Sequence, residues 1–167
     1  MPKAKAPTFP DPDHDHAPCR TEALDKAERL CRTTGKKLTN IRRRVLETVW
    51  ESHRPIGAYD ILAKLNQDGG RTAPIIIYRA LEFLMDNGLV HRLASLNAFI
   101  GCSHPEHDHA AGFLICKECG STVEIESKKL NDALASSVAA RGFAVDTQVV
   151  ELRGLCPHCN RQRAYAQ

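Results

Sequence analysis

The start of the sequence lacks the features of a targeting or membrane segment. The opening MPKAKAPTFP carries two lysines, but no apolar run of about seven residues or more follows them. A bilayer span would need a much longer apolar stretch. We therefore expect no signal peptide, no membrane association and a cytoplasmic protein.

Aromatic residues are also few, at 5%, beside 43% hydrophobic and 26% charged residues. This balance is ordinary for a globular protein and argues against wholesale disorder. The 167 residues can bury one good core or two small ones. The formal net charge of +3 is only a weak sign of a polyanionic partner.

Basic residues are concentrated in one short stretch, which contains Lys36, Lys37, Arg42, Arg43 and Arg44. A concentrated patch of this kind can meet phosphate groups. A solvated helix face explains the run of charge equally well. The patch therefore becomes informative only together with the predicted fold.

Residues 1–19 are predicted to be a disordered tail, because they hold many prolines and show no helical or strand period. The Asp-His-Asp-His at 13–16 could hold a metal loosely. A flexible histidine pair closes no defined coordination sphere, so a solvated tail is the favoured interpretation.

Four helices and a hairpin are indicated between residues 20 and 100. The helices are expected from Arg20 to Gly35, from Thr39 to before Pro55, within GAYDILAKLNQDGG, and from a start at Thr72 and Pro74 to Asn87-Gly88, with Thr72 as the suggested N-cap of the last helix. The strand-like pieces LVHRL and AFIG follow, separated by ASLN. This order is typical of a winged helix-turn-helix, whose helix after the turn enters the DNA major groove.

A different pattern begins after residue 110. GFLICKECGSTVEIE alternates like two strands, a helix is expected at about 128–141, and FAVDTQVVEL indicates a further strand. Pairing with a second copy would cover the open edge of so small a sheet. We therefore predict an α+β homodimer with a winged-helix DNA-binding domain at 20–100, a hinge at 101–112 and a small α/β dimerisation domain at 113–167. Gly101 and Gly112 could make the hinge flexible.

Cysteine spacing predicts a metal site. A reducing cytoplasm keeps thiols free, so the seven cysteines favour metal binding over disulfides. Two Cys-x-x-Cys pairs can surround one tetrahedral structural zinc with four thiolates, namely Cys116, Cys119, Cys156 and Cys159. A thiol-disulfide redox pair would need only one such motif, within a thioredoxin-like βαβ pattern that is not found.

Further candidate ligands gather near the junction of the two predicted domains: His91, Cys102, His104, His107, His109 and Glu124. His91 and Cys102 belong to the predicted hairpin or its edge, whereas His109 and Glu124 belong to the C-terminal domain. A metal that takes both pairs would bridge the domains. His104 and His107 share a loop with His109 and could replace it. Cys19 and Cys31 fit neither group, and are interpreted as a tail thiol and a small apolar helix residue.

The chain resembles the ferric uptake regulator family of bacterial metal-dependent repressors, and most closely its zinc uptake regulator branch. The segments that carry the resemblance are LTNIRRRVLE, SHRPIGAYDIL, IYRALEFLMDNGLVHRL, FLICKECG and the closing CPHC. Together they extend over about residues 20–160. One departure is Ile75-Ile76-Ile77, where the family commonly has threonine before Val-Tyr-Arg. That departure makes any transfer of a detailed operator sequence unsafe.

The resemblance implies two zinc ions per chain. It assigns the Cys-x-x-Cys pairs to structural zinc and His91, Cys102, His109 and Glu124 to a regulatory zinc. The thiolate of Cys102 favours zinc over iron, because iron sensors of this family use mainly histidine and carboxylate ligands. The implied function is a zinc-responsive repressor that binds operator DNA as a zinc-loaded dimer and represses zinc-uptake genes.

The implied DNA-binding residues lie on the winged helix. Arg79 is the best candidate base reader, because a guanidinium can grip guanine with two hydrogen bonds. The resemblance gives Tyr59 and Arg79 roles in operator recognition and sets Arg42 near phosphates. Tyr78 is expected to contact backbone or thymine methyl groups, although a core or surface role is also open. Ile75 and Ile76 could contact thymine methyl groups or pack on the preceding helix.

Two rival functions are considered. A zinc-dependent hydrolase would activate water at an open coordination position. Full coordination by protein side chains argues against it, so we expect no enzyme activity and no small-molecule substrate. The other rival is a sensor of the same family for iron, manganese or peroxide, which would differ in the metal that restores operator binding.

Overall fold

The structure is a computed structural model that describes residues 9–10, 14–67, 71–106, 109 and 111–165. It divides into two compact units, one spanning Pro10–Asp108 and one built mainly from His109–Gln167. We call them the winged-helix unit and the C-terminal unit. None of the helices in the described ranges is long and apolar enough to cross a membrane.

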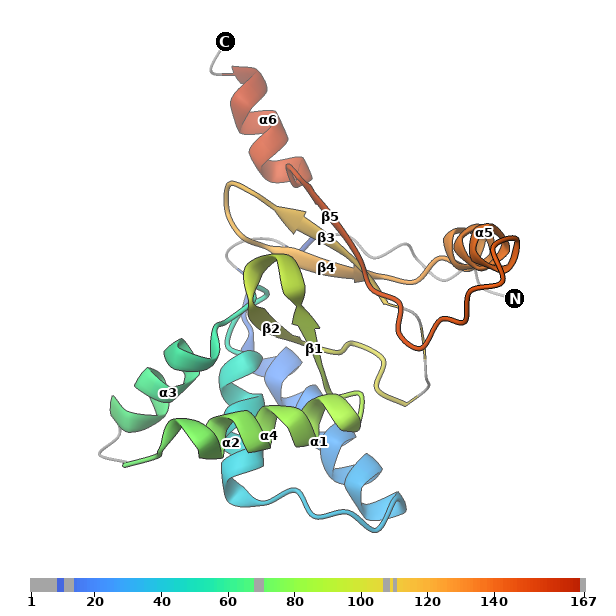
Figure 1. The fold of residues 1–167 in the computed structure, drawn as a ribbon. Coiled ribbons are helices and arrows are strands. Elements are labelled where there is room, and N and C mark those ends of the chain that lie inside the picture. The colour runs from blue at the N-terminus through green and yellow to red at the C-terminus, as the bar shows by residue number, and fades with distance from the viewer. Residues whose placement is uncertain (1–8, 11–13, 68–70, 107–108, 110, 166–167) are drawn as a thin grey trace. The chain divides into compact units, whose positions relative to one another are not determined.

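The winged-helix unit has the predicted order of elements (Figure 1). Its helices are α1 (Ala17–Thr33), α2 (Asn40–Val49), α3 (Ala58–Gln67) and α4 (Pro74–Asp86). The wing consists of β1 (Val90–Leu93), a short 3-10 turn η1 (Ala94–Leu96) and β2 (Ala98–Gly101). The strands are antiparallel, with Val90 opposite Gly101 and Leu93 opposite Ala98. The α+β prediction is thus confirmed.

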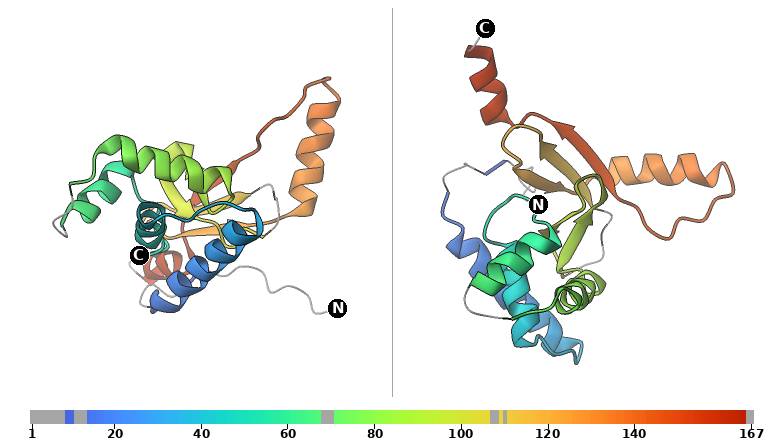
Figure 2. Two further views of the ribbon diagram at one scale, coloured as in Figure 1. Left: turned by 90° about the horizontal axis from the view of Figure 1, so that it is seen from below. Right: turned by 60° about the vertical axis from the view of Figure 1, so that its left-hand side comes forward.

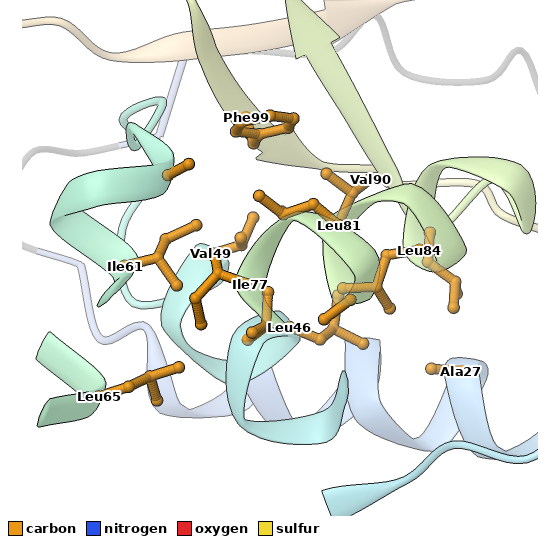
Figure 3. Packing of buried hydrophobic residues seen from close by; sticks show 14 of the residues in the cluster. Ala27, Leu46, Val49, Ile61, Leu65, Ile77, Leu81, Leu84, Val90 and Phe99 are labelled. Atoms are coloured by element: carbon orange, nitrogen blue, oxygen red, sulfur yellow. The ribbon is translucent and has the colours of Figure 1, made fainter. Parts of the chain in front are cut away.

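The core of the winged-helix unit consists of the apolar stripes that the sequence predicted (Figure 3). Ala27 of α1, Leu46 and Val49 of α2, Ile61 and Leu65 of α3, and Ile77, Leu81 and Leu84 of α4 are all buried. Val90 and Phe99 of the wing join the same cluster. The hairpin is therefore held to the helices by apolar packing, which fixes the wing relative to α4.

Helix α1 begins at Ala17, within the predicted tail, because Pro18 is tolerated in a first helical turn. Residues 1–8 and 11–13 of that tail lie outside the described residues. Helix α4 begins at Pro74, as the sequence suggested, but Thr72 is not its N-cap residue. Ala73 occupies the N-cap position, and the Thr72 amide instead donates to Asn66 Oδ1 at 2.8 Å. Asn66 Nδ2 donates in return to the Thr72 carbonyl at 3.2 Å, which closes the α3–α4 turn.

The C-terminal unit contains a three-stranded mixed sheet. Its elements are β3 (Gly112–Cys116), β4 (Thr122–Ile125), α5 (Lys128–Ala139), β5 (Val150–Gly154) and α6 (Pro157–Tyr165). The strand order is β4-β3-β5, with β3 antiparallel to β4 and parallel to β5. The final strand is shorter than FAVDTQVVEL suggested, and α6 was not predicted from the sequence.

Much of the apolar surface in the C-terminal unit is exposed. Helix α5 has no buried residue, and it projects from the end of β4 in the views of Figures 1 and 2. Phe143, Val145, Val149 and Leu152 along β5 and its approach are all at least 48% exposed. The single chain therefore leaves the β5 edge of its sheet and the adjoining apolar side chains uncovered.

Gly101 has a steric role in the winged-helix unit. A Cβ atom at this position would lie 2.2 Å from the Trp50 ring. Non-bonded carbon atoms essentially never lie this close together. The close approach of β2 to the Trp50 ring therefore requires glycine at position 101. The sequence had suggested Gly101 only as a source of flexibility.

We predict that Gly101→Ala destabilises the winged-helix unit by about 1–3 kcal/mol, because overpacking forces the Trp50 ring to move. Urea unfolding followed by circular dichroism measures the loss. Trp50→Leu removes the ring, so the double variant should recover part of the stability lost by Gly101→Ala. Strictly additive losses in the two single variants would contradict the steric explanation.

Candidate metal centres and nucleic-acid interface

Four cysteines of the C-terminal unit come together as the spacing predicted. The Sγ atoms of Cys116, Cys119, Cys156 and Cys159 lie within 4.8 Å of one another. Cys119 Sγ and Cys156 Sγ are 3.8 Å apart. Sulfurs bound to one tetrahedral zinc at about 2.3 Å would also be separated by about 3.8 Å. The donor set and its spacing therefore fit zinc.

Backbone hydrogen bonds position the four cysteines, and backbone amides favour the thiolate form of one of them. The Gly120 amide donates to the Cys116 carbonyl at 2.9 Å, and Gly120 has a φ of 74° that suits glycine. The Cys156 amide donates to Cys116 Sγ at 3.3 Å. Burial would raise the pKa of Cys116, but the amides of Cys119, Cys156 and Glu118 lower it to about 6. Desolvation and the neighbouring sulfurs raise the pKa of Cys159 to about 12. A cation among them would relieve this conflict.

Two further candidate ligands lie on the wing. His91 is in β1, and Cys102 directly follows β2, where its amide donates to the Leu89 carbonyl at 3.0 Å. This hydrogen bond continues the hairpin, so His91 and Cys102 occupy diagonal positions on one face of it. The Sγ atom of Cys102 lies within 4.8 Å of a His91 ring nitrogen. The wing thus presents one imidazole and one buried thiol together.

The C-terminal unit carries the second pair of candidate ligands. Glu124 lies on β4 opposite Phe113 of β3, and His109 precedes β3. His109 Nε2 and Glu124 Oε1 are 2.5 Å apart, with only 5% and 6% of the two side chains exposed. In this contact the imidazole donates to the carboxylate. An ion between them would take the place of that proton.

The loop histidines differ from His109. His104 is exposed, whereas His107 lies outside the described residues. Cys31 is buried in the core of α1, and burial raises the pKa of its thiol, so its apolar role is confirmed. Cys19 is part of α1 rather than of a tail.

A third cluster includes His14 of the Asp-His-Asp-His segment, which the sequence analysis interpreted as part of a solvated tail, together with Cys19 and His53, which the sequence did not connect with it. His14 and His53 Nε2 atoms are 3.2 Å apart, and His14 Nε2 lies 3.4 Å from Cys19 Sγ. The ring of His16 lies 4.3 Å from His14 and 4.8 Å from His53, measured between centroids. Burial, followed by the charges of His14 and His16, lowers the pKa of His53 to about 4. His14 and His53 are 39 positions apart, so no local spacing could have revealed the cluster.

Three of the four predicted DNA-binding residues share one face of the winged-helix unit. Tyr59 is 69% exposed at the start of α3, Tyr78 is 45% exposed on α4, and Arg79 beside it is exposed. They line a hollow of about 640 Å³ together with Ile75 and the wing residue Arg92. Sequence reasoning missed Arg92, whose guanidinium is exposed and donates to Asn97 Oδ1 at 3.0 Å.

Arg42 and the other basic residues of its stretch are already engaged within the winged-helix unit. The Arg42 guanidinium stacks 3.5 Å from the Phe83 ring centroid and donates to the Lys37 carbonyl at 2.7 Å. Arg43 forms ion pairs with Glu28 and Glu47, and Arg44 donates to the Leu65 carbonyl at 3.3 Å. Much of the basic run therefore joins helices to one another.

Comparisons with known proteins identify the family of the chain. The sequence pattern of the Ferric uptake regulator family matches residues 33–153, which is more than half of the chain. The chain belongs to the ferric uptake regulator family. This membership makes it a regulator of transcription and not an enzyme.

Among its relatives, this ferric uptake regulator family member is 33% identical to the zinc uptake regulation protein of Escherichia coli (strain K12) over 139 residues, or 83% of this chain and 81% of that protein. The structure of a zinc uptake regulator complexed with zinc and DNA matches with a TM-score of 0.82 and 32% identity, covering 87% of this chain and 97% of that one. The holo form of XcZur matches with a TM-score of 0.78 and 39% identity, covering 84% and 98%.

For this family member we predict that Cys159→Ser removes metal from the four-cysteine site and unfolds the C-terminal unit. The few buried apolar residues there leave folding dependent on the metal. Zinc content measured by atomic emission and secondary structure measured by circular dichroism should both fall. Cys31→Ser is the matched control, because Cys31 lies outside every ligand cluster, and its zinc content should equal that of the parent. A folded, fully metallated Cys159→Ser protein would contradict the prediction.

Proposed function

We propose that this protein is a zinc-responsive repressor that binds operator DNA as a zinc-loaded homodimer and represses zinc-uptake genes in the cytoplasm. The observation that carries the proposal is the position of His91 and Cys102 on the wing of the same unit that exposes Arg79. A metal bound by the wing can influence how that unit meets DNA. The similarity to zinc uptake regulators along most of the chain supports this function.

Two zinc sites with different roles are part of the proposal. Cys116, Cys119, Cys156 and Cys159 hold a structural zinc, and the closed set of four thiolates leaves no position for substrate. His91, Cys102, His109 and Glu124 hold the regulatory zinc. The pairing of donors within each unit supports the second assignment, because each unit supplies two ligands that are already close together.

Zinc is the metal that best suits the regulatory ligands. A thiolate with two imidazoles and one carboxylate is a borderline-soft set that suits zinc. Iron and manganese prefer sets richer in oxygen donors. The thiol of Cys102 thus favours a zinc sensor over the iron, manganese and peroxide sensors of the same family.

Charge alone does not explain a zinc switch. The regulatory zinc adds two positive charges and releases the thiol proton of Cys102, so the net charge rises by about one. A change of this size has only a modest effect on binding to phosphates. The mechanism therefore has to be geometric.

A zinc ion that takes two ligands from each unit binds tightly only when the two pairs reach coordination distance. Zinc then selects one arrangement of the units from a mobile population. In a dimer this selection fixes the spacing of the two α4 helices, which must match successive major grooves. The relative XcZur supports metal-linked rearrangement: its holo and apo forms match this chain with TM-scores of 0.78 and 0.51 at equal identity, so the two forms differ in conformation.

DNA is read by the exposed face of α4 in this proposal. Arg79 contacts base edges, and Tyr59 and Tyr78 flank it on the same hollow. Arg42 contributes to phosphate binding through the guanidinium N–H groups that Lys37 does not use. Ile75, which is 57% exposed, is available to thymine methyl groups rather than packed on α3.

The homodimer is supported by the exposed surface of the C-terminal unit. The edge strand β5, the unburied helix α5 and the apolar side chains near them would be costly to leave in water. A second copy with the same surfaces covers them symmetrically.

The regulatory site is tested with Cys102→Ser and Glu124→Ala. Each variant should remain a folded dimer with its structural zinc but lose the zinc-dependent gain in operator affinity, which we expect to be about 5- to 150-fold. Fluorescence anisotropy with operator DNA in buffered zinc measures the gain.

The exposed loop residue His104 provides the control, because His104→Ala should respond like the parent. A normal zinc response in Cys102→Ser or Glu124→Ala rejects this ligand set. A parent that responds to iron or manganese but not to zinc rejects the zinc assignment.

The DNA face is tested with Arg79→Ala. Loss of a bidentate base contact costs about 1–3 kcal/mol, so operator affinity should fall about 5- to 150-fold at saturating zinc. Affinity for unrelated DNA should fall much less, because base contacts carry the specificity. Arg161→Ala, which removes an exposed arginine from α6, should leave both affinities unchanged. Equal losses on operator and unrelated DNA would instead make Arg79 a phosphate contact.

A further inference from the structure

The cluster formed by His14, Cys19 and His53 is used by neither proposed zinc site. One potential ligand atom from each residue lies within 4.8 Å of the other two. The residues come from the segment before α1, the first turn of α1 and the loop after α2. All three belong to the winged-helix unit. The cluster is therefore independent of how the two units are arranged.

The spacing of these atoms fits a shared tetrahedral ion. Two nitrogens bound to zinc at about 2.0–2.1 Å lie about 3.3 Å apart, and a zinc-bound nitrogen and sulfur lie about 3.6 Å apart. The corresponding separations here are 3.2 Å between His14 and His53 and 3.4 Å between His14 and Cys19. Both values are within a few tenths of an ångström of the edges of a zinc tetrahedron.

Hydrogen bonding alone accounts for the cluster less well. His14 Nε2 takes part in both short contacts. A ring nitrogen offers either one proton or one lone pair in the ring plane, so it cannot make two full hydrogen bonds. A cation placed among the three atoms accepts a lone pair from each of them.

His16 is the nearest additional donor. Its ring lies beside those of His14 and His53, and its Nδ1 is buried and makes no hydrogen bond with any residue that the structure describes. A buried imidazole nitrogen without a partner carries a desolvation penalty that a metal or a metal-bound water would relieve. His16 therefore lies next to the cluster but is not one of the three residues whose potential ligand atoms lie within 4.8 Å of one another.

We propose that His14, Cys19 and His53 form a third metal site, which binds zinc and ties the segment before α1 to the loop after α2. Imidazole and thiolate ligands together select zinc over magnesium, calcium or manganese. Three protein ligands leave one position for His16 or water. The site does not depend on the regulatory function, because its ligands all come from one unit.

The site is tested by zinc protection of Cys19. The full-length protein is treated with a thiol-alkylating reagent with and without zinc, and modification of the Cys19 peptide is followed by mass spectrometry. Zinc should slow this reaction at least tenfold in the parent. The protection should be lost in His53→Ala and in His14→Ala. His14 precedes α1 and is no part of the apolar core, so its replacement cannot act by unfolding the domain.

Two controls separate this site from the others. His158→Ala removes an exposed histidine from α6 and should keep the protection of Cys19. Cys102→Ser should also keep it, even if that variant loses the zinc response on DNA. Metal analysis should find one zinc fewer per chain in His53→Ala than in the parent. Equal alkylation of Cys19 with and without zinc, or protection that persists in His53→Ala, would overturn the third site.

Discussion

The folding of the C-terminal unit depends on its four clustered sulfur atoms. Its buried apolar side chains are few: Phe113, Ile115 and Val123, with the smaller Ala111, are the only ones apart from cysteines in the described part of this unit. Helix α5 buries nothing, and α6 follows directly from the second Cys-x-x-Cys pair. A core of this size does not offset the chain entropy of so many ordered residues. In the proposed structural zinc site, metal–thiolate bonds between β3, the following turn and the start of α6 would supply the missing free energy.

The winged-helix unit is stabilised in a different way, and this difference suits a sensor. Its four helices and wing share one continuous apolar cluster, so apolar packing is its main source of stability. Its proposed ligands His91 and Cys102 lie on the wing, which is fixed to the core through Val90 and Phe99. A metal bound there acts on the whole unit rather than on a flexible loop. In the proposed mechanism, zinc changes the position of the winged-helix unit without changing its internal structure.

Periodic and closely spaced features of this chain could be predicted from its sequence, and contacts between distant segments could not. The apolar stripe Ile77, Ala80, Leu81 and Leu84 is buried as a 3.6-residue period requires. The spacing of the two Cys-x-x-Cys pairs was enough to predict that their four cysteines form one candidate metal site. The cap of α4 was missed because Asn66, in the preceding helix, binds the backbone of Thr72 and removes it from a capping role. The His14–His53 contact was missed because it joins segments that only the packing of α1 against α2 brings together.

The basic stretch from Lys36 to Arg44 is less available to DNA phosphates than its composition suggests, because several of its side chains have partners within the winged-helix unit. Lys36 donates to Asn87 Oδ1 at 2.6 Å, and Arg43 is held between Glu28 and Glu47. These groups connect α2 and the loop before it to α1 and to the end of α4, so part of the run of charge serves the fold. The exposed residues of α4 are instead mixed in character: Pro74, Ile75, Ile76, Tyr78, Arg79, Glu82 and Asp86. In the proposed complex with DNA, such a surface binds the phosphate backbone weakly but offers one guanidinium and several apolar contacts to base edges. Its affinity therefore depends on correct placement in the groove, which is the property that a zinc-selected geometry can control.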